Sequence, residues 1–147
     1  MKVDDINIEI IKYLRDGRLS YRKIADTLGL SENTIRSRVK SLTEEGILEV
    51  TGLVDPDAIA GHRVVFVGVK LSALNLVEKG KEIAELKGVV SVSVVTGRFD
   101  LMLVVLLKDG FDLLEFYTQE VYRLEGIRSV ETFVVYKGYN LKVPYIL

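Results

Sequence analysis

The sequence of 147 residues contains no cysteine, no tryptophan, a single histidine (His62) and two prolines. Without cysteine it has neither a disulfide framework nor a thiolate metal site, which fits a cytoplasmic protein. A lone histidine in a linker is typical of a surface or capping residue, so we expect no metal site and no cofactor. The longest apolar run, Leu101 to Leu107, is too short to cross a membrane, so no membrane partner is expected.

The overall charge is close to zero, with 20 basic and 21 acidic residues, so the whole-molecule balance does not indicate a nucleic-acid partner. The local balance between residues 22 and 42 differs, because five basic side chains lie there against two acidic ones. The basic side chains are Arg22, Lys23, Arg36, Arg38 and Lys40. Such a patch is typical of a nucleic-acid-binding surface, although many solvated helices are also basic.

Residues 20–46 predict two short helices joined by a tight turn. Ser20 and Ser31 are suited to cap them, and Gly29 ends the first helix where a positive φ is accommodated most easily. Apolar residues at Ile6, Ile10, Ile11 and Leu14 predict a preceding helix over residues 4–15. The three apolar faces would form one small core. This stretch is therefore interpreted as a helix-turn-helix within a trihelical unit.

The second helix of this motif has a solvent-facing side whose residue types suit base edges and phosphates. We expect four residues to contact bases directly and five to lie nearer phosphates. The first group is Asn33, Thr34, Ser37 and Arg38; the second is Arg22, Lys23, Ser31, Arg36 and Lys40. Ser31 is expected mainly to cap its helix. The alternative interpretation is an ordinary amphipathic helix with a polar outer face.

The chain beyond residue 50 has a different composition. Residues 51–62 are expected to form a hinge between a DNA-binding domain over 1–50 and a second domain over 63–147, and Asp55-Pro56 ends an extended segment within it. β-branched runs predict strands over residues 64–71, 89–96, 99–107 and 127–136, and helices are expected over 75–86 and 112–124. The order β-α-β-β-α-β indicates a ferredoxin-like domain. The predicted fold class is α+β, with a winged or trihelical helix-turn-helix domain in front.

Several predicted strands are apolar at nearly every position, whereas a strand with one wet face should alternate. Residues 101–107 (LMLVVLL) are the clearest example. Both faces of the sheet must then be covered, and helices account for only one. We expect a second copy of the sheet to cover the other, which predicts a homodimer. The tail, residues 138–147, is expected to add an edge strand, where Pro144 is tolerated.

The two units in this order resemble the Lrp/AsnC (feast/famine) family of transcription regulators. The resemblance covers the whole chain and includes Asp4 with Ile10-Ile11, the stretch LSENTIRSRVKSLTEEGIL, Asp55-Pro56, and TGRFDL over residues 96–101. Asn7 departs from it, because the family often has a second aspartate there. The resemblance implies that the second domain is a RAM domain, that dimers often assemble into octamers, and that amino acids bind near the hairpin between dimers.

The predicted hairpin is the candidate effector site. A free amino acid needs a carboxylate for its ammonium group and N–H donors for its carboxylate, which Asp100 and the backbone around Gly97 could supply. By resemblance, Gln119 and Thr132 lie where relatives contact their effectors. The candidate effector residues are Gly97, Arg98, Phe99, Asp100, Gln119 and Thr132. The alternative is an ordinary turn with a solvated Arg98.

These observations predict a sequence-specific regulator that binds a pseudo-palindromic site on double-stranded DNA and responds to an amino acid or a related metabolite. Two alternatives are a chromatin-like architectural DNA binder without an effector, and an enzyme. Sirohaem decarboxylases resemble these regulators in architecture but depend on histidine and arginine around a tetrapyrrole, and this chain has one histidine. We therefore expect that the protein is not an enzyme.

Overall fold

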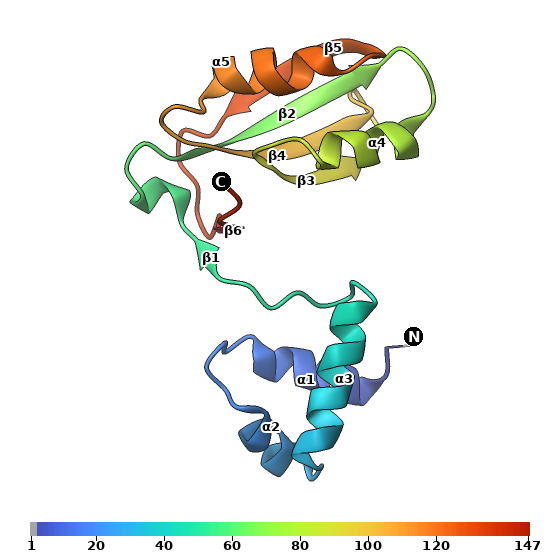
Figure 1. Ribbon diagram of the computed structural model, residues 1–147, viewed down its shortest axis with the longest axis vertical. Coiled ribbons are helices and arrows are strands. Elements are labelled where there is room, and N and C mark those ends of the chain that lie inside the picture. The colour runs from blue at the N-terminus through green and yellow to red at the C-terminus, as the bar shows by residue number, and fades with distance from the viewer. Residues whose placement is uncertain (1–2) are drawn as a thin grey trace. The chain divides into compact units, whose positions relative to one another are not determined.

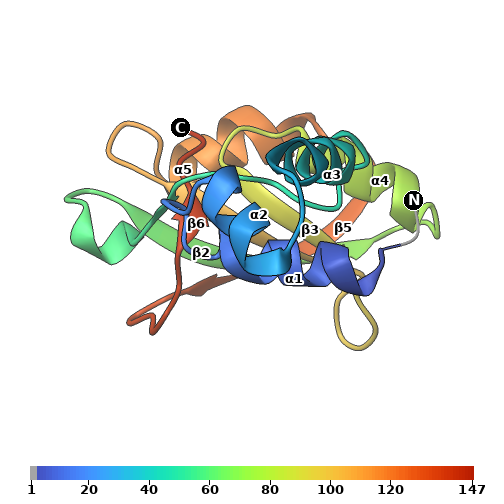
Figure 2. The same cartoon turned by 90° about the horizontal axis from the view of Figure 1, so that it is seen from below.

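The structure, a computed structural model, describes residues 3–147. The chain divides into two compact units; the first ends at Thr51 and the second spans Gly52–Leu147. The expected hinge over residues 51–62 is therefore not a separate unit, because residues 52–62 group with the second unit. The first unit contains α1 (Asp5–Leu14), α2 (Tyr21–Leu28) and α3 (Glu32–Glu44). Figure 1 shows all three helices, and Figure 2 shows α3 viewed nearly along its axis.

The expected caps of the first unit are confirmed. The side chains of Ser20 and Ser31 accept hydrogen bonds from the backbone N–H groups of Lys23 and Thr34, and Gly29 ends α2 with a φ of 66°. Each serine satisfies an amide that the first helical turn leaves without a partner. Between Val3 and Thr51 the structure describes no strand, so this unit is trihelical and has no wing hairpin.

The core of the first unit consists of apolar residues from all three helices: Ile10, Ile24, Ala25, Ile35 and Val39. One expected core position is wrong. Ile6 is 38% exposed, and the neighbouring Asn7 is instead buried at 1% exposure. A buried amide is stable only when it is hydrogen-bonded, and Asn7 has such partners, described below.

The second unit begins with β1 (Leu53–Val54) and η1 (Pro56–Ala58). Its main elements are β2 (Arg63–Leu71), α4 (Leu76–Ala84), β3 (Val89–Val94), β4 (Leu101–Leu107), α5 (Leu113–Glu115), η2 (Phe116–Glu120), η3 (Val121–Arg123), β5 (Ile127–Val134) and β6 (Val143–Pro144). The four long strands form an antiparallel sheet in the order β3-β4-β2-β5. This confirms the predicted ferredoxin-like arrangement.

The helix expected over residues 112–124 is not one regular α-helix. It starts as α5, widens into the π-helical turn η2 and tightens into the 3₁₀ turn η3. Phe116, the first residue of the wide turn, is fully buried, and its ring packs edge-on against Phe111 and Tyr117. The change of helical pitch also alters the apolar face: Leu114 is 66% exposed, whereas Leu113 packs against the core.

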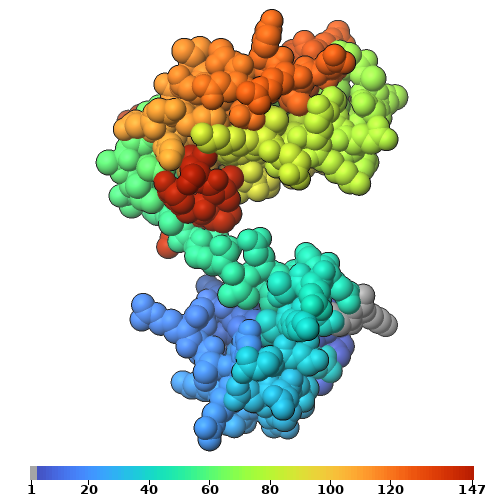
Figure 3. All heavy atoms as spheres, in the orientation of Figure 1, coloured from blue at the N-terminus to red at the C-terminus, as the bar shows by residue number. Residues whose placement is uncertain are grey.

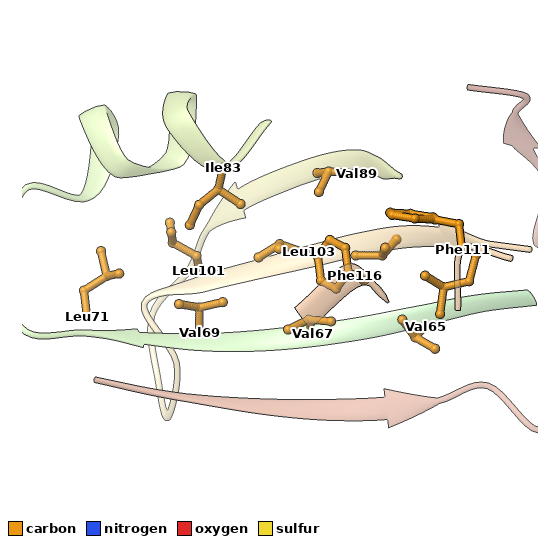
Figure 4. Close-up of a cluster of buried hydrophobic side chains, with 12 residues drawn as sticks. Val65, Val67, Val69, Leu71, Ile83, Val89, Leu101, Leu103, Phe111 and Phe116 are labelled. Carbon is orange, nitrogen blue, oxygen red and sulfur yellow. The ribbon is translucent and has the colours of Figure 1, made fainter. Parts of the chain in front are cut away.

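The main core lies between the sheet and its helices. Alternate residues of β2 and β4 point to one face, where they meet Ile83 of α4 and Phe116 of η2, as Figure 4 shows. The strand residues of this cluster are Val65, Val67, Val69, Leu71, Val89, Leu101, Leu103, Val105 and Leu107. Each such side chain contributes about 1.5–3 kcal/mol when fully buried, so this layer fixes the sheet on which the candidate sites lie.

The second face of the sheet is covered in part by the chain's own tail. β6 pairs with β1 in a separate two-stranded sheet, with Val54 opposite Val143. Val143 packs against Val64 and Leu106 of the main sheet. Figure 3 shows the C-terminal residues, in dark red, gathered on the second unit. The tail thus forms an edge strand, as expected, and its partner is β1 and not a strand of the main sheet.

The rest of the second face stays partly open. Phe66, Met102 and Val104 are half-buried, and Phe133 is 41% exposed. Register places Phe66 opposite both Val104 and Phe133, so these side chains lie on one face of neighbouring strands. The tail thus covers one end of this face of the sheet. The remainder of the face is apolar and partly exposed.

Candidate DNA-binding and effector sites

The structure sorts the outer residues of α3 into two stripes. Asn33, Arg36, Ser37 and Lys40 are exposed and recur at helical spacing, so they form one solvent-facing stripe. Thr34 and Arg38 lie between this stripe and the buried positions, and both are only partly exposed. We call the first set the outer stripe. It contains two of the four residues expected to contact bases and two expected to lie near phosphates.

The cations of the outer stripe have weak partners within the helix. Arg36 donates to Glu32 at 2.7 Å and lies 5.3 Å above the ring of Tyr21. Lys40 lies 3.7 Å from Glu44. Ion pairs between exposed side chains contribute only about 0–1 kcal/mol, so a phosphate can replace either carboxylate at little cost. On α2, Arg22 and Lys23 are exposed and have no ion-pair partner among residues 3–147.

Arg38 is held by the protein itself. Its Nη1 donates to both carboxylate oxygens of Asp4, at 2.9 and 2.8 Å, and to the Oδ1 of buried Asn7 at 2.9 Å. The pKa of Asp4 is lowered by the hydrogen bond from Arg38 and, next, by the amide of Asn7. Arg38 therefore ties α3 to the start of α1. This geometry opposes the expectation that Arg38 reads a base, because its Nη1 group is already engaged within the chain.

Ser31 and Thr34 also have partners within the chain. Their hydroxyl groups lie 2.8 Å apart, and the Ser31 oxygen accepts from the Thr34 amide. Both remain at the N-terminal end of α3, where backbone N–H groups favour an anion. Ser31 thus acts as the expected cap, and a phosphate contact by Ser31 and a base contact by Thr34 stay predictions.

The hairpin after β3 is less available to a ligand than the sequence suggested. Lys70 donates to one oxygen of Asp100 at 2.8 Å, and the amide of Leu71 donates to the other at 2.8 Å. The Lys70 hydrogen bond and then the Leu71 amide lower the pKa of the Asp100 carboxyl group. Asp100 thus fastens the hairpin to β2. The expectation that it receives a ligand's ammonium group is opposed by this pairing, which local sequence patterns could not reveal.

The other expected effector residues fall on opposite sides of the sheet. Arg98 pairs with Glu131 at 2.9 Å, and Phe99 packs edge-on against Phe133, both on the second face. Thr132 lies on the helix side, where its hydroxyl is 2.6 Å from that of Tyr117. Gly97 and Gln119 are exposed. A single chain therefore does not bring Gly97, Arg98, Phe99, Asp100, Gln119 and Thr132 together in one pocket.

Across residues 3–147 no group of three or more histidine, cysteine, aspartate or glutamate side chains is arranged to hold a metal ion. His62 instead contacts the carbonyl of Ala60 and the hydroxyl of Tyr145, at 2.9 and 3.2 Å. In the same described range, every helix is too short or too polar to span a bilayer.

Comparison with known proteins matches both units. Residues 3–49 match the winged helix-turn-helix DNA-binding model, and residues 64–142 match the Lrp/AsnC ligand binding domain. The chain is 31% identical to the HTH-type transcriptional regulator FL11 of Pyrococcus furiosus, with 92% of this chain and 90% of that protein covered. It is 30% identical to the regulator Ptr1 of Methanocaldococcus jannaschii, with 94% and 95% covered.

A solved structure has the same fold. The transcriptional regulator NMB0573 of Neisseria meningitidis, in complex with L-Met, superposes with a TM-score of 0.68 at 22% identity, covering 99% of this chain and 96% of that one. At this identity the likeness establishes the fold alone. The two family models and the two regulators establish more: a DNA-binding unit followed by a ligand-binding unit.

Proposed function

Because the chain belongs to the Lrp/AsnC family of transcriptional regulators, we propose that it acts as a two-fold dimer that binds a pseudo-palindromic DNA site under the control of an amino acid. The outer stripe of α3 carries this proposal. It presents an amide, a hydroxyl and two weakly paired cations on one exposed helix face. These groups suit base edges and phosphates, and the site of action would be the cytoplasm.

The proposed contacts follow the exposure of the side chains. Asn33 and Ser37 would reach base edges, while Arg36 and Lys40 would bind phosphates. Arg22 and Lys23 would add backbone contacts from α2. Two copies related by a two-fold axis would place their α3 helices in major grooves about one helical turn apart, roughly 34 Å.

The proposed dimer forms through the second face of the sheet. An area that includes Phe66, Met102 and Phe133 is apolar and incompletely covered by the tail. A face of this kind is stabilised when a second copy removes it from water. Assembly of dimers into an octamer is part of the same proposal, and contacts between dimers would complete any effector site at the hairpin.

The proposed effector is a small amino acid. The matched ligand-binding domain supports a small-molecule effector, and the complex of the Neisseria regulator with L-Met supports this chemical class. Binding would change DNA affinity only to the extent that the ligand prefers one arrangement of the protein over another.

Selection of DNA sites from a random pool by the purified protein, with and without an amino-acid mixture, tests the proposal. We expect a two-fold consensus whose strength changes with the mixture. Recovery of DNA without any consensus would contradict sequence-specific regulation and support an architectural binder instead.

Variants of the outer stripe locate the DNA surface. Arg36→Ala and Lys40→Ala should each lower the slope of log affinity against log salt by about 1, because each removes one phosphate contact. Lys12→Ala is the matched control, since Lys12 is an exposed cation on α1 that pairs with Glu9 in a similar way, at 2.6 Å. An equal effect of all three substitutions would show that general charge, and not the outer stripe, sets the affinity.

Light scattering tests the dimer. Phe133→Glu should shift the protein towards monomer, because it places a charge in the proposed interface. Tyr122→Glu alters a side chain that is 88% exposed on η3 and serves as the control. If both variants keep the wild-type mass, the second face is not the interface.

A further inference from the structure

A cavity of about 380 Å³ lies where the start of β2, the end of β4 and the start of α5 meet. Sequence patterns did not indicate it, because its lining comes from residues 61–65, 107–114 and 134. Four charged side chains line it: Arg63, Lys108, Asp109 and Asp112. Its volume is near the lower end of the range for ligand pockets, about 300–1,000 Å³, so it suits a small molecule.

The charges of this cavity are balanced only in part by the chain itself: hydrogen bonds with Glu115 and Leu114 and, after them, the attraction of Arg63 lower the pKa of the Asp112 carboxyl group. Among the described residues, Arg63, Lys108 and Asp109 make no ion pair and no side-chain hydrogen bond. The Asp112 side chain belongs to the capping box of α5, where it accepts from the backbone amides of Leu114, at 2.7 Å, and of Glu115. The two cations and the Asp109 carboxylate are therefore available to a ligand that carries both signs of charge.

The loop that carries Lys108 and Asp109 is fixed in place. Lys108 and Phe111 exchange two backbone hydrogen bonds, of 3.1 and 2.9 Å, and the Phe111 side chain is buried. The carboxylate of Asp109 lies directly against Gly61, where a Cβ atom would collide with it. Both charged side chains are thus presented from a preformed turn, which reduces the entropy that ligand binding would cost.

The remaining wall is apolar and incompletely buried. Leu114 and Val134 line the cavity and are 66% and 58% exposed, respectively. Leu113 and Val65 complete this wall. An apolar group lying against these side chains would remove them from water. The cavity therefore combines cations, anions and an apolar surface within the reach of one small molecule.

We propose that this cavity binds an α-amino acid with an apolar side chain. Its carboxylate pairs with Arg63 and Lys108, its ammonium group pairs with Asp109, and its side chain lies on Leu114 and Val134. The proposal rests on the proposed control by an amino acid and assigns that control to a site away from the hairpin. The bound ligand contacts Asp109 beside Gly61, in the segment that leads from η1 into β2, so binding acts on that segment.

Calorimetric titration of the full chain with L-leucine, L-valine and L-methionine tests the site. Arg63→Gln and Asp109→Asn should each weaken binding at least about tenfold, because each removes a charge-assisted hydrogen bond. Arg98→Gln and Gln119→Ala are the matched controls at the hairpin and on η2, and both should leave the affinity unchanged. The reverse pattern would overturn the proposal in favour of the hairpin.

Two analogues of leucine test the need for both charges. 3-Methylbutylamine lacks the carboxylate and 4-methylpentanoate lacks the ammonium group, so each should bind at least about tenfold more weakly than leucine. Equal binding of either analogue would overturn the zwitterion assignment. Val134→Phe fills the cavity without removing a charge and should also abolish binding. Melting curves of every variant establish that it is folded.

The outcome is separable from the proposed function. Absence of binding by all three amino acids would overturn the cavity assignment, whereas selection of a two-fold DNA consensus would still support the regulator. If the mixture changes DNA selection but Arg63→Gln preserves that response, an effector acts elsewhere and the cavity is not its site.

Discussion

The hairpin after β3 and the cavity beside α5 contain the same kinds of side chain but balance their charges differently. At the hairpin, Asp100 pairs with Lys70 and Arg98 pairs with Glu131. At the cavity, Arg63, Lys108 and Asp109 have no such partners among residues 3–147. The sequence patterns predicted ligand contacts only at the hairpin. Charged groups that are already paired within the chain thus serve the fold, whereas charged groups without an ion pair at a cavity are available to a ligand.

The largest expected effect tests how firmly the hairpin is fixed. A Cβ atom at Gly68 would lie 2.6 Å from the ring of Phe99, so Gly68→Ala must displace Phe99 from the sheet. We expect a loss of about 2–3 kcal/mol in the free energy of unfolding, the upper part of the range for overpacked sites. Urea denaturation measures it.

A glycine with room around it provides the control. The nearest atom to a Cβ at Gly80 of α4 would be 3.9 Å away, so Gly80→Ala should be neutral or stabilise by up to about 1 kcal/mol. Combining Gly68→Ala with Phe99→Leu should recover part of the loss. Equal effects at both glycines would show that Phe99 does not fix the hairpin.

The next largest effect is expected on α3, where Arg38 is held within the chain and Arg36 is exposed. Arg38→Ala leaves the Oδ1 of buried Asn7 without its donor, which should cost about 2 kcal/mol of unfolding free energy. Arg36→Ala removes only an exposed pair and should cost less than about 1 kcal/mol, while weakening DNA binding more. Thermal melts and DNA titrations of both variants are the measurements. A larger loss of stability from Arg36→Ala would invert the roles of the two arginines.

A smaller effect is expected in the pH dependence of the protein's stability. Lys70 holds the pKa of Asp100 below the ordinary aspartate value of about 3.9, so its stabilising contribution is complete above that value. This contribution is lost as the pH falls through the lowered pKa of the folded state. Asp100→Asn should therefore be less stable than wild type at pH 7, and the gap should narrow below about pH 4. Melting temperatures across this range measure the gap; a constant gap would exclude the ionised carboxylate as its cause.

The smallest effect is expected at the cavity. Without ligand, Asp109→Asn should change the free energy of unfolding by less than about 0.5 kcal/mol, because Asp109 is exposed and makes no ion pair in the described chain. Urea denaturation beside Asp100→Asn gives the direct contrast. A loss as large as that of Asp100→Asn would assign Asp109 to the fold and contradict its availability to a ligand.

Local patterns predicted much of the fold. Caps such as Ser20 and Ser31 act within three residues, and β-branched runs indicate strands directly. The helices of the first unit and the order of strands and helices in the second unit could therefore be predicted from the sequence. The partners of Arg38 and Asp100 were not, since Asp4 and Lys70 lie 34 and 30 residues away in the chain. The cavity was equally hidden, because three separate segments build it.

The pairing of β1 with β6 has a consequence for how this chain can be rearranged. Leu53 lies opposite Pro144, so the first and last strands of the second unit are neighbours. Proteins whose chain ends meet in this way tolerate circular permutation and insertion into other domains. The second unit is therefore a self-closing module. A helix-turn-helix unit fused after Leu147, instead of before Gly52, would be attached near the same point, which makes the order of the two units a matter of genetic arrangement and not of folding.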